Sequence, residues 1–174
     1  MQIRQTGQLK GVTVRAPNDN RMATAATMKR MSAIVKRESS KPFVINLARQ
    51  IVVRVPAKNF PAEAAAVQEW VRQNIRYTRD PYFSETLQTP EVTVTQGHGD
   101  CDDHAILAAS LISALGGAVR FRAIRIPGNG PNLAHVLTET RIGRGWVPVE
   151  TTEPWPFGQY PDSIDLRDSM VRHL

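Results

Sequence analysis

Hydrophobic periodicity changes sharply near residue 117, and this change restricts the possible folds more than any other feature of the chain. Before it, DCDDHAILAASLISALGG has apolar residues at helical spacing, Asp100 as a candidate N-cap and two glycines as a stop. After it, VRFRAIRI alternates apolar and polar residues, which is typical of a strand with one buried face. LAHVLTETRI and WVPVETT predict two more strands, joined as a hairpin through Gly143, Arg144 and Gly145. A helix followed by an antiparallel meander predicts an α+β fold.

The N-terminal part of the chain predicts helices. Residues 21–37 carry a methionine-rich apolar stripe at helical spacing, which we interpret as a docking face, with Asn20 as a candidate N-cap. Residues 43–55 are strongly apolar and are compatible with a helix or a strand. A further helix is predicted from about 61 to 76, because Pro61 suits a first helical turn and one face of the following segment is apolar.

Two segments lack a periodic pattern. Residues 78–99 contain two prolines and two glycines, so we predict a long loop there, and a loop of this length is a candidate lid over a site. The proline-rich stretch EPWPFGQYPDS is expected to pack irregularly and to be followed by a short C-terminal helix.

Composition excludes several classes of protein. The 174 residues are 41% hydrophobic and 22% charged, which suits one soluble domain and excludes disordered and collagen-like chains. No apolar run approaches the roughly 18 residues of a spanning helix, and the N-terminus lacks the apolar segment of a secretory signal. A lone cysteine excludes an intramolecular disulfide. We therefore expect a protein without a signal peptide or a membrane partner that works in the cytoplasm or in an assembly loaded from it.

The net charge of +6 raises the question of nucleic-acid binding. However, lysine and arginine are spread along the chain without a cluster of five or more. No glycine-flanked aromatic pair of the kind that stacks on single strands is found. A basic solvated surface is therefore expected instead of a specific nucleic-acid site.

The stretch GHGDCDDH, residues 97–104, holds the lone cysteine among three aspartates and two histidines. Cysteine reacts as the thiolate, and the first turn of a helix stabilises an anion, so Cys101 is a candidate nucleophile. Its neighbours Asp100, Asp102 and Asp103 oppose thiolate formation, because like charges repel. Position alone is therefore insufficient, and the cysteine needs a base.

His135 is the candidate base, and Glu150 is its candidate partner. If the hairpin turn centres between Ile142 and Gly143, the two residues lie opposite each other; one residue later, they become diagonal neighbours. Either register brings the carboxylate within about 5 to 8 Å of the imidazole. A carboxylate that orients a histidine, which in turn activates a cysteine, is the logic of a catalytic triad.

A metal site is the main alternative chemistry. His98, Cys101 and His104 recur every three residues, and cysteine and histidine suit zinc. Only His104 shares a helical face with Cys101, and no fourth ligand is evident. Calcium is less favoured, because three nearly consecutive aspartates at a helix start point to different sides. His104 is interpreted as a helix-surface or loop-pinning residue.

Three segments together resemble the transglutaminase-like superfamily of papain-like thiol enzymes: GDCDDHAILAASLISALGG, AHVLTET and GWVPVETT. The resemblance covers about residues 60–155, and TRDPYFSETLQTP leading into GHGDCDDHA is similar to small members encoded by phages and prophages. It implies a papain-like core in which the nucleophile helix packs on an antiparallel sheet. We accordingly expect an N-terminal arm and helical extension over residues 1–58 and a catalytic domain over residues 59–174.

The resemblance also implies roles for individual residues: Cys101 as nucleophile, His135 as general base and acid, and Glu150 as the orienting carboxylate, where the superfamily usually has aspartate. Gln96 is a candidate second oxyanion donor beside the Cys101 N–H, and Asp103 is a candidate support that bonds a neighbouring loop. The expected reaction is acyl transfer on protein or peptide amides, by a peptidase, an amidase or a transglutaminase, without a metal or an organic cofactor.

A non-catalytic protein that keeps the same fold is the alternative function. Phage virion parts often act by binding, so the methionine-rich helix and the basic surface would then be assembly faces and virion proteins the partners. Against this alternative stands the complete set of cysteine, histidine and acid, which a purely structural descendant has no physical reason to keep.

Overall fold

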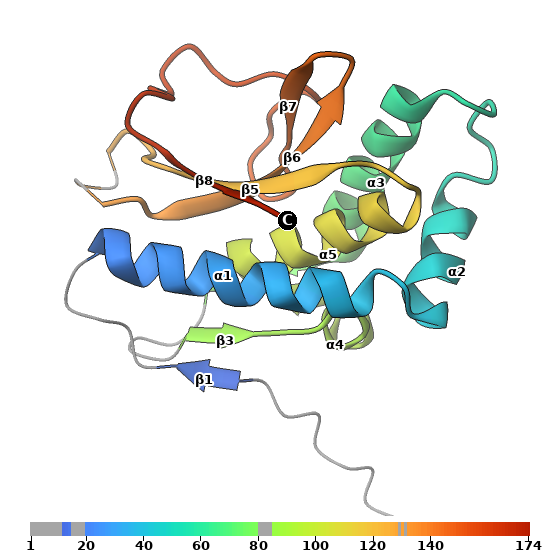
Figure 1. Ribbon diagram of the computed structural model, residues 1–174, viewed down its shortest axis with the longest axis horizontal. Helices are drawn as coiled ribbons and strands as arrows, with labels where there is room; N and C mark the ends of the chain where they lie inside the picture. Colours follow the sequence, from blue (N-terminus) through green and yellow to red (C-terminus); the bar gives the residue numbers. More distant parts are fainter. Residues whose placement is uncertain (1–11, 15–19, 80–84, 129, 131) are drawn as a thin grey trace, which may run out of the picture.

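A four-stranded antiparallel sheet forms one layer of the protein (Figure 1). Its strand order is β7 (Gly145–Val149), β6 (His135–Ile142), β5 (Val119–Ile124) and β8 (Met170–His173). This computed structural model describes residues 12–14, 20–79, 85–128, 130 and 132–174. With helices packed on one face of the antiparallel sheet, the fold belongs to the predicted α+β class.

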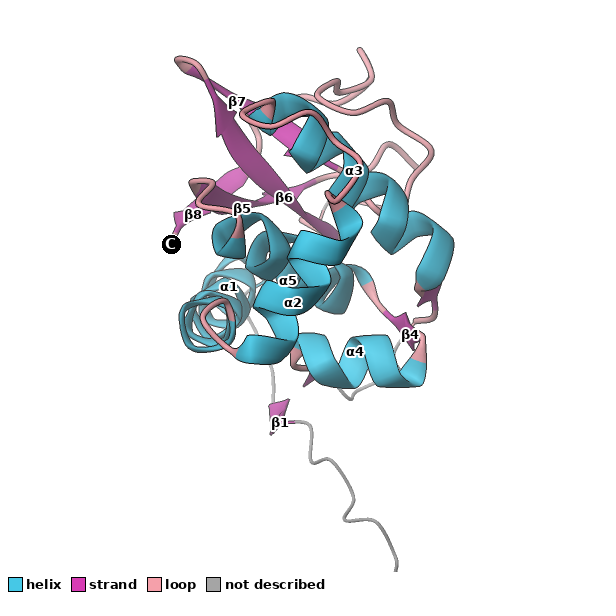
Figure 2. Ribbon diagram, turned by 90° about the vertical axis from the view of Figure 1, so that its right-hand side faces the viewer, coloured by secondary structure: helices cyan, strands magenta, loops and turns pink. Residues whose placement is uncertain are grey.

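Helix α5 (Cys101–Ala114) lies at the centre of the molecule. One side of it packs on the sheet, where the Thr138 hydroxyl donates a hydrogen bond of 2.8 Å to the Ala105 carbonyl. Four helices enclose its other sides (Figure 2): α1 (Asn20–Glu38), α2 (Pro42–Ile51), α3 (Phe60–Asn74) and α4 (Pro90–Gln96). Because every residue from Asp102 to Ile112 is buried, α5 is a core helix around which the other elements assemble.

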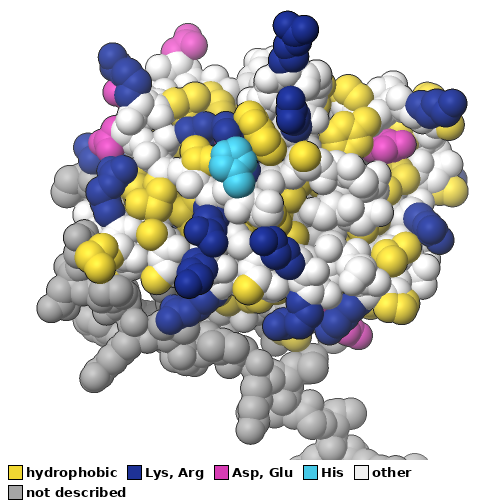
Figure 3. All heavy atoms as spheres, viewed as in Figure 1, with side chains coloured by type: hydrophobic (Ala, Val, Ile, Leu, Met, Phe, Trp, Pro, Cys, Tyr) yellow, Lys and Arg dark blue, Asp and Glu magenta, His cyan; other side chains and the backbone are white. Residues whose placement is uncertain are grey.

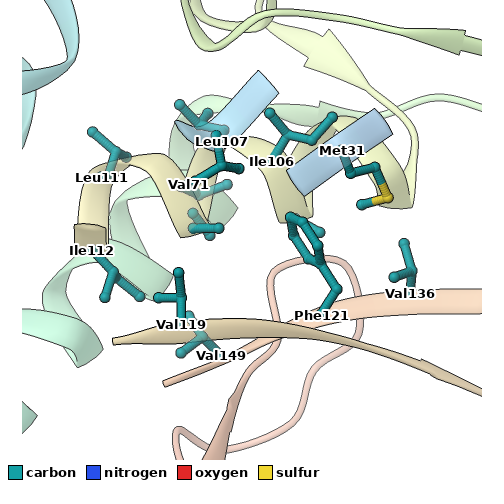
Figure 4. Packing of buried hydrophobic residues seen from close by; sticks show 14 of the residues in the cluster. Met31, Val71, Ile106, Leu107, Leu111, Ile112, Val119, Phe121, Val136 and Val149 are labelled. Atoms are coloured by element: carbon teal, nitrogen blue, oxygen red, sulfur yellow. The ribbon is translucent and has the colours of Figure 1, made fainter. Parts of the chain in front are cut away.

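Apolar side chains fill the space between α5 and the sheet (Figure 4). Phe121 of β5 is fully buried and points at the helices, close to Ile106 of α5 and Met31 of α1. Complete burial of a side chain of this size contributes about 1.5–3 kcal/mol. The alternation predicted for β5 is observed, with Arg120 and Arg122 on the opposite face, where both pair with the buried Glu139.

The methionine-rich stripe of α1 faces the interior of its own chain. Met28 and Met31 are 1% and 0% exposed and belong to the same core as α5, whereas Met22 is 64% exposed. Asn20 is the first residue of the helix, and its side-chain oxygen accepts a hydrogen bond from the backbone N–H of Leu133. The docking face is thus internal, so the buried methionines are not available to a partner.

The long loop predicted over residues 78–99 is wrong for the part of it that the structure describes. This part contains β3 (Glu85–Leu87), α4 and β4 (His98–Gly99), and residues 80–84 lie outside the described residues. Strands of two or three residues are too short to show periodicity. Helix α4 has only seven residues, but its signals were present: a proline in the first turn and, at its end, Gly97 in the left-handed conformation. The buried Thr93 shows that this helix packs against the rest of the chain.

The short strands connect distant segments. β3 pairs antiparallel with β1 (Val12–Val14), and β2 (Arg76–Tyr77) pairs parallel with β4. Most of the apolar segment 43–55 forms a helix, α2.

The C-terminal helix predicted after the proline-rich stretch is wrong, because β8 forms there and pairs antiparallel with β5. Four residues, Met-Val-Arg-His, carry too little pattern to separate a strand from a helical turn. The hairpin between β6 and β7 forms as predicted, with Gly143 in the left-handed conformation at its turn.

The surface carries basic side chains without a single concentrated patch on the face that Figure 3 shows. Lysine and arginine are distributed over this face among apolar and uncharged groups. Among the described residues, no helix combines the length and the apolar character that crossing a membrane requires.

Candidate active site

Cys101 is the first residue of α5 and is partly exposed. The preceding Asp100 caps the helix, and its side chain accepts hydrogen bonds from the backbone N–H groups of Asp102 and Asp103 at 3.0 and 3.2 Å. Asp103 completes a capping box, because its carboxylate also accepts from the Asp100 N–H. Gly99 is required here, since a Cβ at this position would lie 2.6 Å from the Asp103 Cβ. The residues around Cys101 therefore fix its backbone position at the start of α5.

The charges around Cys101 hold its thiol in the protonated form. Burial raises the pKa of the Cys101 thiol well above its ordinary value, and Asp102, Asp100 and Glu150 raise it further. The thiol donates a weak hydrogen bond to the Asp102 carboxylate, with the sulfur 3.7 Å from Oδ1. The backbone N–H of Val136 acts in the opposite direction, because it stabilises the thiolate. Electrostatics alone therefore do not activate this cysteine.

His135 and Glu150 are joined by a hydrogen bond of 2.6 Å between Nε2 and Oε2. Ile142 pairs with Gly145 across the hairpin, so the turn lies one residue later than the midpoint between Ile142 and Gly143. The second of the two predicted registers is therefore the one observed, and His135 and Glu150 are diagonal neighbours on β6 and just after β7. Both side chains are buried, at 8% and 1% exposure.

Hydrogen bonds to the Glu150 carboxylate keep it ionised. Burial by itself raises the pKa of Glu150, but the His135 ring and the backbone N–H groups of Thr152 and Glu153 lower it below its ordinary value. The Thr152 hydroxyl also donates to Oε1 at 2.9 Å. With one oxygen held by its own turn and the other by His135, the carboxylate has a fixed orientation.

Helix α3 supports the same turn through Gln68. Its side-chain oxygen accepts from the Glu150 N–H at 3.1 Å, and its side-chain nitrogen donates to the Trp155 carbonyl at 3.2 Å. The Trp155 ring meets the His135 ring edge-on, with 6.2 Å between centroids. Gln68 and Trp155 were not identified from the sequence, because only the folded chain brings α3 to the segment after β7.

Two cavities meet at Cys101 and His135, which line both of them. The larger, about 480 Å³, is here named the polar cavity; its other lining residues include Tyr77, Arg79, Asp100, Thr152 and Glu153. The smaller, about 170 Å³, is named the α1 cavity; its other lining residues include Thr24, Met28, Met31, Asp102, Leu133 and Val136. A substrate bound across both cavities would pass the thiol and the imidazole together.

Tyr77 is a site residue that the sequence did not reveal. It ends β2, whose pairing with β4 places it beside Gly99, two residues before Cys101. Burial and the nearby Cys101 raise the pKa of the Tyr77 phenol, while a hydrogen bond with Arg79 acts in the opposite direction. The phenol therefore keeps its proton and can donate it to an acceptor in the polar cavity. Its position directly after a predicted helix was the only available signal.

The structure does not bring Gln96 to the cysteine. Gln96 is exposed at the last residue of α4 and lines neither cavity. Asp103 is fully buried, and its Oδ1 accepts from the backbone N–H of Gln88 at 2.8 Å. It thus binds a neighbouring segment to the start of α5, as a supporting residue would.

His104 is 1% exposed, so its interpretation as a helix-surface residue is wrong. Burial lowers the pKa of its ring, although the carbonyls of Arg76 and Thr151 and the charge of Glu150 partly oppose the shift. Although these carbonyls act on the ring, neither ring nitrogen makes a hydrogen bond of good geometry within the described part of the chain. The part of the chain that the structure covers contains no group of three histidine, cysteine or acidic side chains placed to hold a metal.

Comparison with known proteins identifies relatives of the fold. A model of the Transglutaminase-like superfamily matches residues 45–151, which is more than half of the chain. A crystal structure described as a "putative protease" from Parabacteroides distasonis matches with a TM-score of 0.57 and 14% identity, over 73% of this chain and 26% of that one. A "putative cysteine protease" from Cytophaga hutchinsonii matches with a TM-score of 0.56 and 18% identity, over 83% and 52%. The chain thus spans only about a quarter and about half of these structures, and no curated protein matches its sequence significantly.

Proposed function

The chain belongs to the transglutaminase-like superfamily, and on this premise we propose that it is a cysteine-dependent enzyme that transfers acyl groups from protein or peptide amides. The observation that carries the proposal is the junction of two cavities at Cys101, with a His135–Glu150 hydrogen bond at the same place. A nucleophile, a base and an oriented acid beside open space are the parts that acyl transfer requires.

The proposed reaction begins with proton transfer. Because Glu150 accepts from Nε2 of His135, Nδ1 is the ring nitrogen left to take the thiol proton. The Cys101 sulfur attacks the amide carbonyl carbon, and the carbon–nitrogen bond of the resulting tetrahedral species breaks. His135 gives its proton to the leaving amine, so an acyl thioester and a neutral histidine remain.

The second half of the reaction returns the enzyme to its starting state. Water or an amine enters the polar cavity, gives its proton to His135 and attacks the thioester carbonyl carbon. The carbon–sulfur bond then breaks, and Cys101 recovers its proton from His135. Water as the acceptor makes the enzyme a peptidase or an amidase, and a lysine amine makes it a transglutaminase.

Two donors are proposed for the oxyanion. The Asp100 side chain accepts from the N–H groups of Asp102 and Asp103, so the proposed first donor is the Cys101 N–H at the first position of α5. The second donor is the Tyr77 hydroxyl, which lines the polar cavity beside the thiol, in place of Gln96. Preorganised donors of this kind typically contribute about 10²–10³-fold to the rate.

Detection of an acyl-enzyme tests the proposal. The protein is mixed with p-nitrophenyl acetate and with a peptide amide library, quenched in acid and weighed by intact-protein mass spectrometry. An acyl adduct that maps to Cys101, disappears in Cys101→Ala and forms at least about tenfold more slowly in His135→Ala supports it. Added lysine methyl ester distinguishes the acceptors, because transamidation yields an acylated amine and hydrolysis yields only the acid.

A non-catalytic role is the competing function. A protein that kept the fold for binding would give no Cys101 adduct, and its thiol would react with iodoacetamide at the same rate with or without His135. The link to phage-encoded members remains a prediction that rests on sequence resemblance alone, and so do virion partners.

A further inference from the structure

We propose that the α1 cavity is a specificity pocket that receives an apolar side chain of the acyl donor, next to the scissile amide. This inference rests on the proposed acyl transfer and adds the class of substrate. The cavity opens at Cys101 and His135 and lies between the N-terminal half of α1, β5 and the start of β6.

Part of the lining of this cavity is apolar. The buried apolar side chains among its lining residues are Met28 and Met31 of α1, Ala123 of β5, Leu133 just before β6 and Val136 within β6. Methionine side chains are flexible and adapt to irregular apolar groups. Because α1 lies outside the residues that match the family model, the specificity of this pocket would belong to this chain's own N-terminal helix.

The volume of the cavity fits one side chain. It measures about 170 Å³, and an apolar cavity of about 150 Å³ is enough to hold a benzene ring. A leucine, methionine or phenylalanine side chain therefore fits, whereas two consecutive side chains do not. The polar residues Thr24, Thr27, Asp100 and Asp102 also line the cavity, next to this apolar part.

The direction of the thiol assigns this pocket to the acyl side. The Cys101 sulfur is directed at the Asp102 carboxylate and the Val136 N–H, and both residues line the α1 cavity but not the polar cavity. An acyl group carried on that sulfur thus lies at the mouth of the α1 cavity. The polar cavity, which is larger and lined by Thr152 and Glu153, is left for the leaving amine and for the acceptor that replaces it.

The test compares p-nitrophenyl esters of N-acetylglycine, N-acetylalanine, N-acetylleucine, N-acetylphenylalanine and N-acetyllysine. The wild-type protein should acylate Cys101 about 10- to 100-fold faster with the leucyl than with the glycyl ester, which is the range that apolar pockets give. Thr24→Phe places a large ring at the rim of the pocket and should reduce the leucyl-to-glycyl ratio to near one. The ratio is the readout, since absolute rates also depend on stability.

Ala25→Phe is the matched control, because it adds the same ring one residue along α1 at an exposed position outside both cavities. This variant should keep the wild-type ratio. Met28→Ala removes part of the floor and should shift the preference from leucyl toward phenylalanyl, with thermal unfolding measured alongside. If Thr24→Phe fails to fold, the ester preference of Met28→Ala tests the proposal instead.

The outcomes separate the two proposals. Without a Cys101 adduct from any ester, p-nitrophenyl acetate included, the proposed function fails. With adducts that form equally fast from all esters, and ratios that neither Thr24→Phe nor Met28→Ala changes, acyl transfer stands and the pocket is overturned. A preference for the lysyl ester also overturns it, since the carboxylate of Asp102 would then select a cation.

Discussion

The two halves of the candidate site are prepared in opposite ways. Around Glu150, hydrogen bonds from His135, Thr152 and Glu153 overcome the cost of burial and lower the pKa of the carboxyl group. Around Cys101, burial and the aspartates raise the pKa of the thiol, and the opposing hydrogen bond from the Val136 N–H does not outweigh them. The ionised form of Glu150 is therefore favoured, whereas the neutral form of Cys101 is favoured.

The difference shows where activation has to come from. A resting thiolate–imidazolium pair would need a positive environment at Cys101, and the acidic first turn of α5 provides the reverse. In the proposed mechanism, the thiol therefore stays protonated until His135 removes its proton during attack. Such a site avoids indiscriminate reaction with electrophiles and depends strongly on its base and on the acid that orients it.

The largest expected loss of activity comes from removing the charge of Glu150. Glu150→Gln removes the carboxylate that orients His135, and kcat should fall by roughly 10²–10⁴-fold, as in other triads that lose their acid. Steady-state kinetics with p-nitrophenyl esters measure it, with the exposed Glu69→Gln as control. A loss of less than about threefold would mean that His135 works without its acid.

The next largest loss of activity is expected from removing the proposed oxyanion donor near Cys101. Tyr77→Phe deletes the proposed oxyanion donor and should lower kcat by about 10²–10³-fold while KM changes little, because the interaction forms mainly in the transition state. Circular dichroism and thermal unfolding check that the variant is folded. A change confined to KM would assign Tyr77 to substrate binding instead.

A smaller change, an increase in the reactivity of the Cys101 thiol, is expected from removing a carboxylate beside it. Asp102→Asn removes a negative charge beside the sulfur, which lowers the pKa of the Cys101 thiol. Iodoacetamide alkylation at pH 7.5 should become several-fold faster, and the pH profile should move to lower pH. Asp165→Asn, an exposed carboxylate paired with Arg167, is the control. Equal rates in all three proteins would remove Asp102 as a cause of the raised pKa.

The smallest effect is on stability in acid. Because the pKa of Glu150 is lowered in the folded state, its contribution is complete above the unfolded value of about 4.3 and is lost as pH falls through the folded pKa. Urea unfolding between pH 3 and 6 should therefore show a steeper loss of free energy in wild type than in Glu150→Gln. Parallel curves would contradict this assignment.

Much of the sheet and of the site was predictable, because short sequence patterns determine these elements. The helix that begins at Cys101 is marked by its cap and stop, and the alternation of β5 and the hairpin turn fix which residues of β6 and β7 meet. His135 and Glu150 lie only 15 residues apart in one hairpin, so two possible registers left little freedom.

The parts that were missed depend on contacts between distant segments. Tyr77 reaches Cys101 through a two-residue parallel pair, and Gln68 reaches Glu150 across 82 residues. No periodic pattern records such contacts. The α1 stripe was recognised as a docking face, but a single sequence does not say whether its partner is another protein or, as observed, the chain's own α5.

The contact between α1 and the far end of the chain has a consequence for folding kinetics. Asn20 bonds Leu133, and Arg21 forms an ion pair with Asp168, 147 residues away. Contacts of such sequence separation slow folding, because the chain entropy is lost before they form. Secondary structure should therefore return early in refolding, and the α1 cavity late. A newly folding chain would form α5, with the candidate nucleophile at its start, before the walls of the proposed specificity pocket.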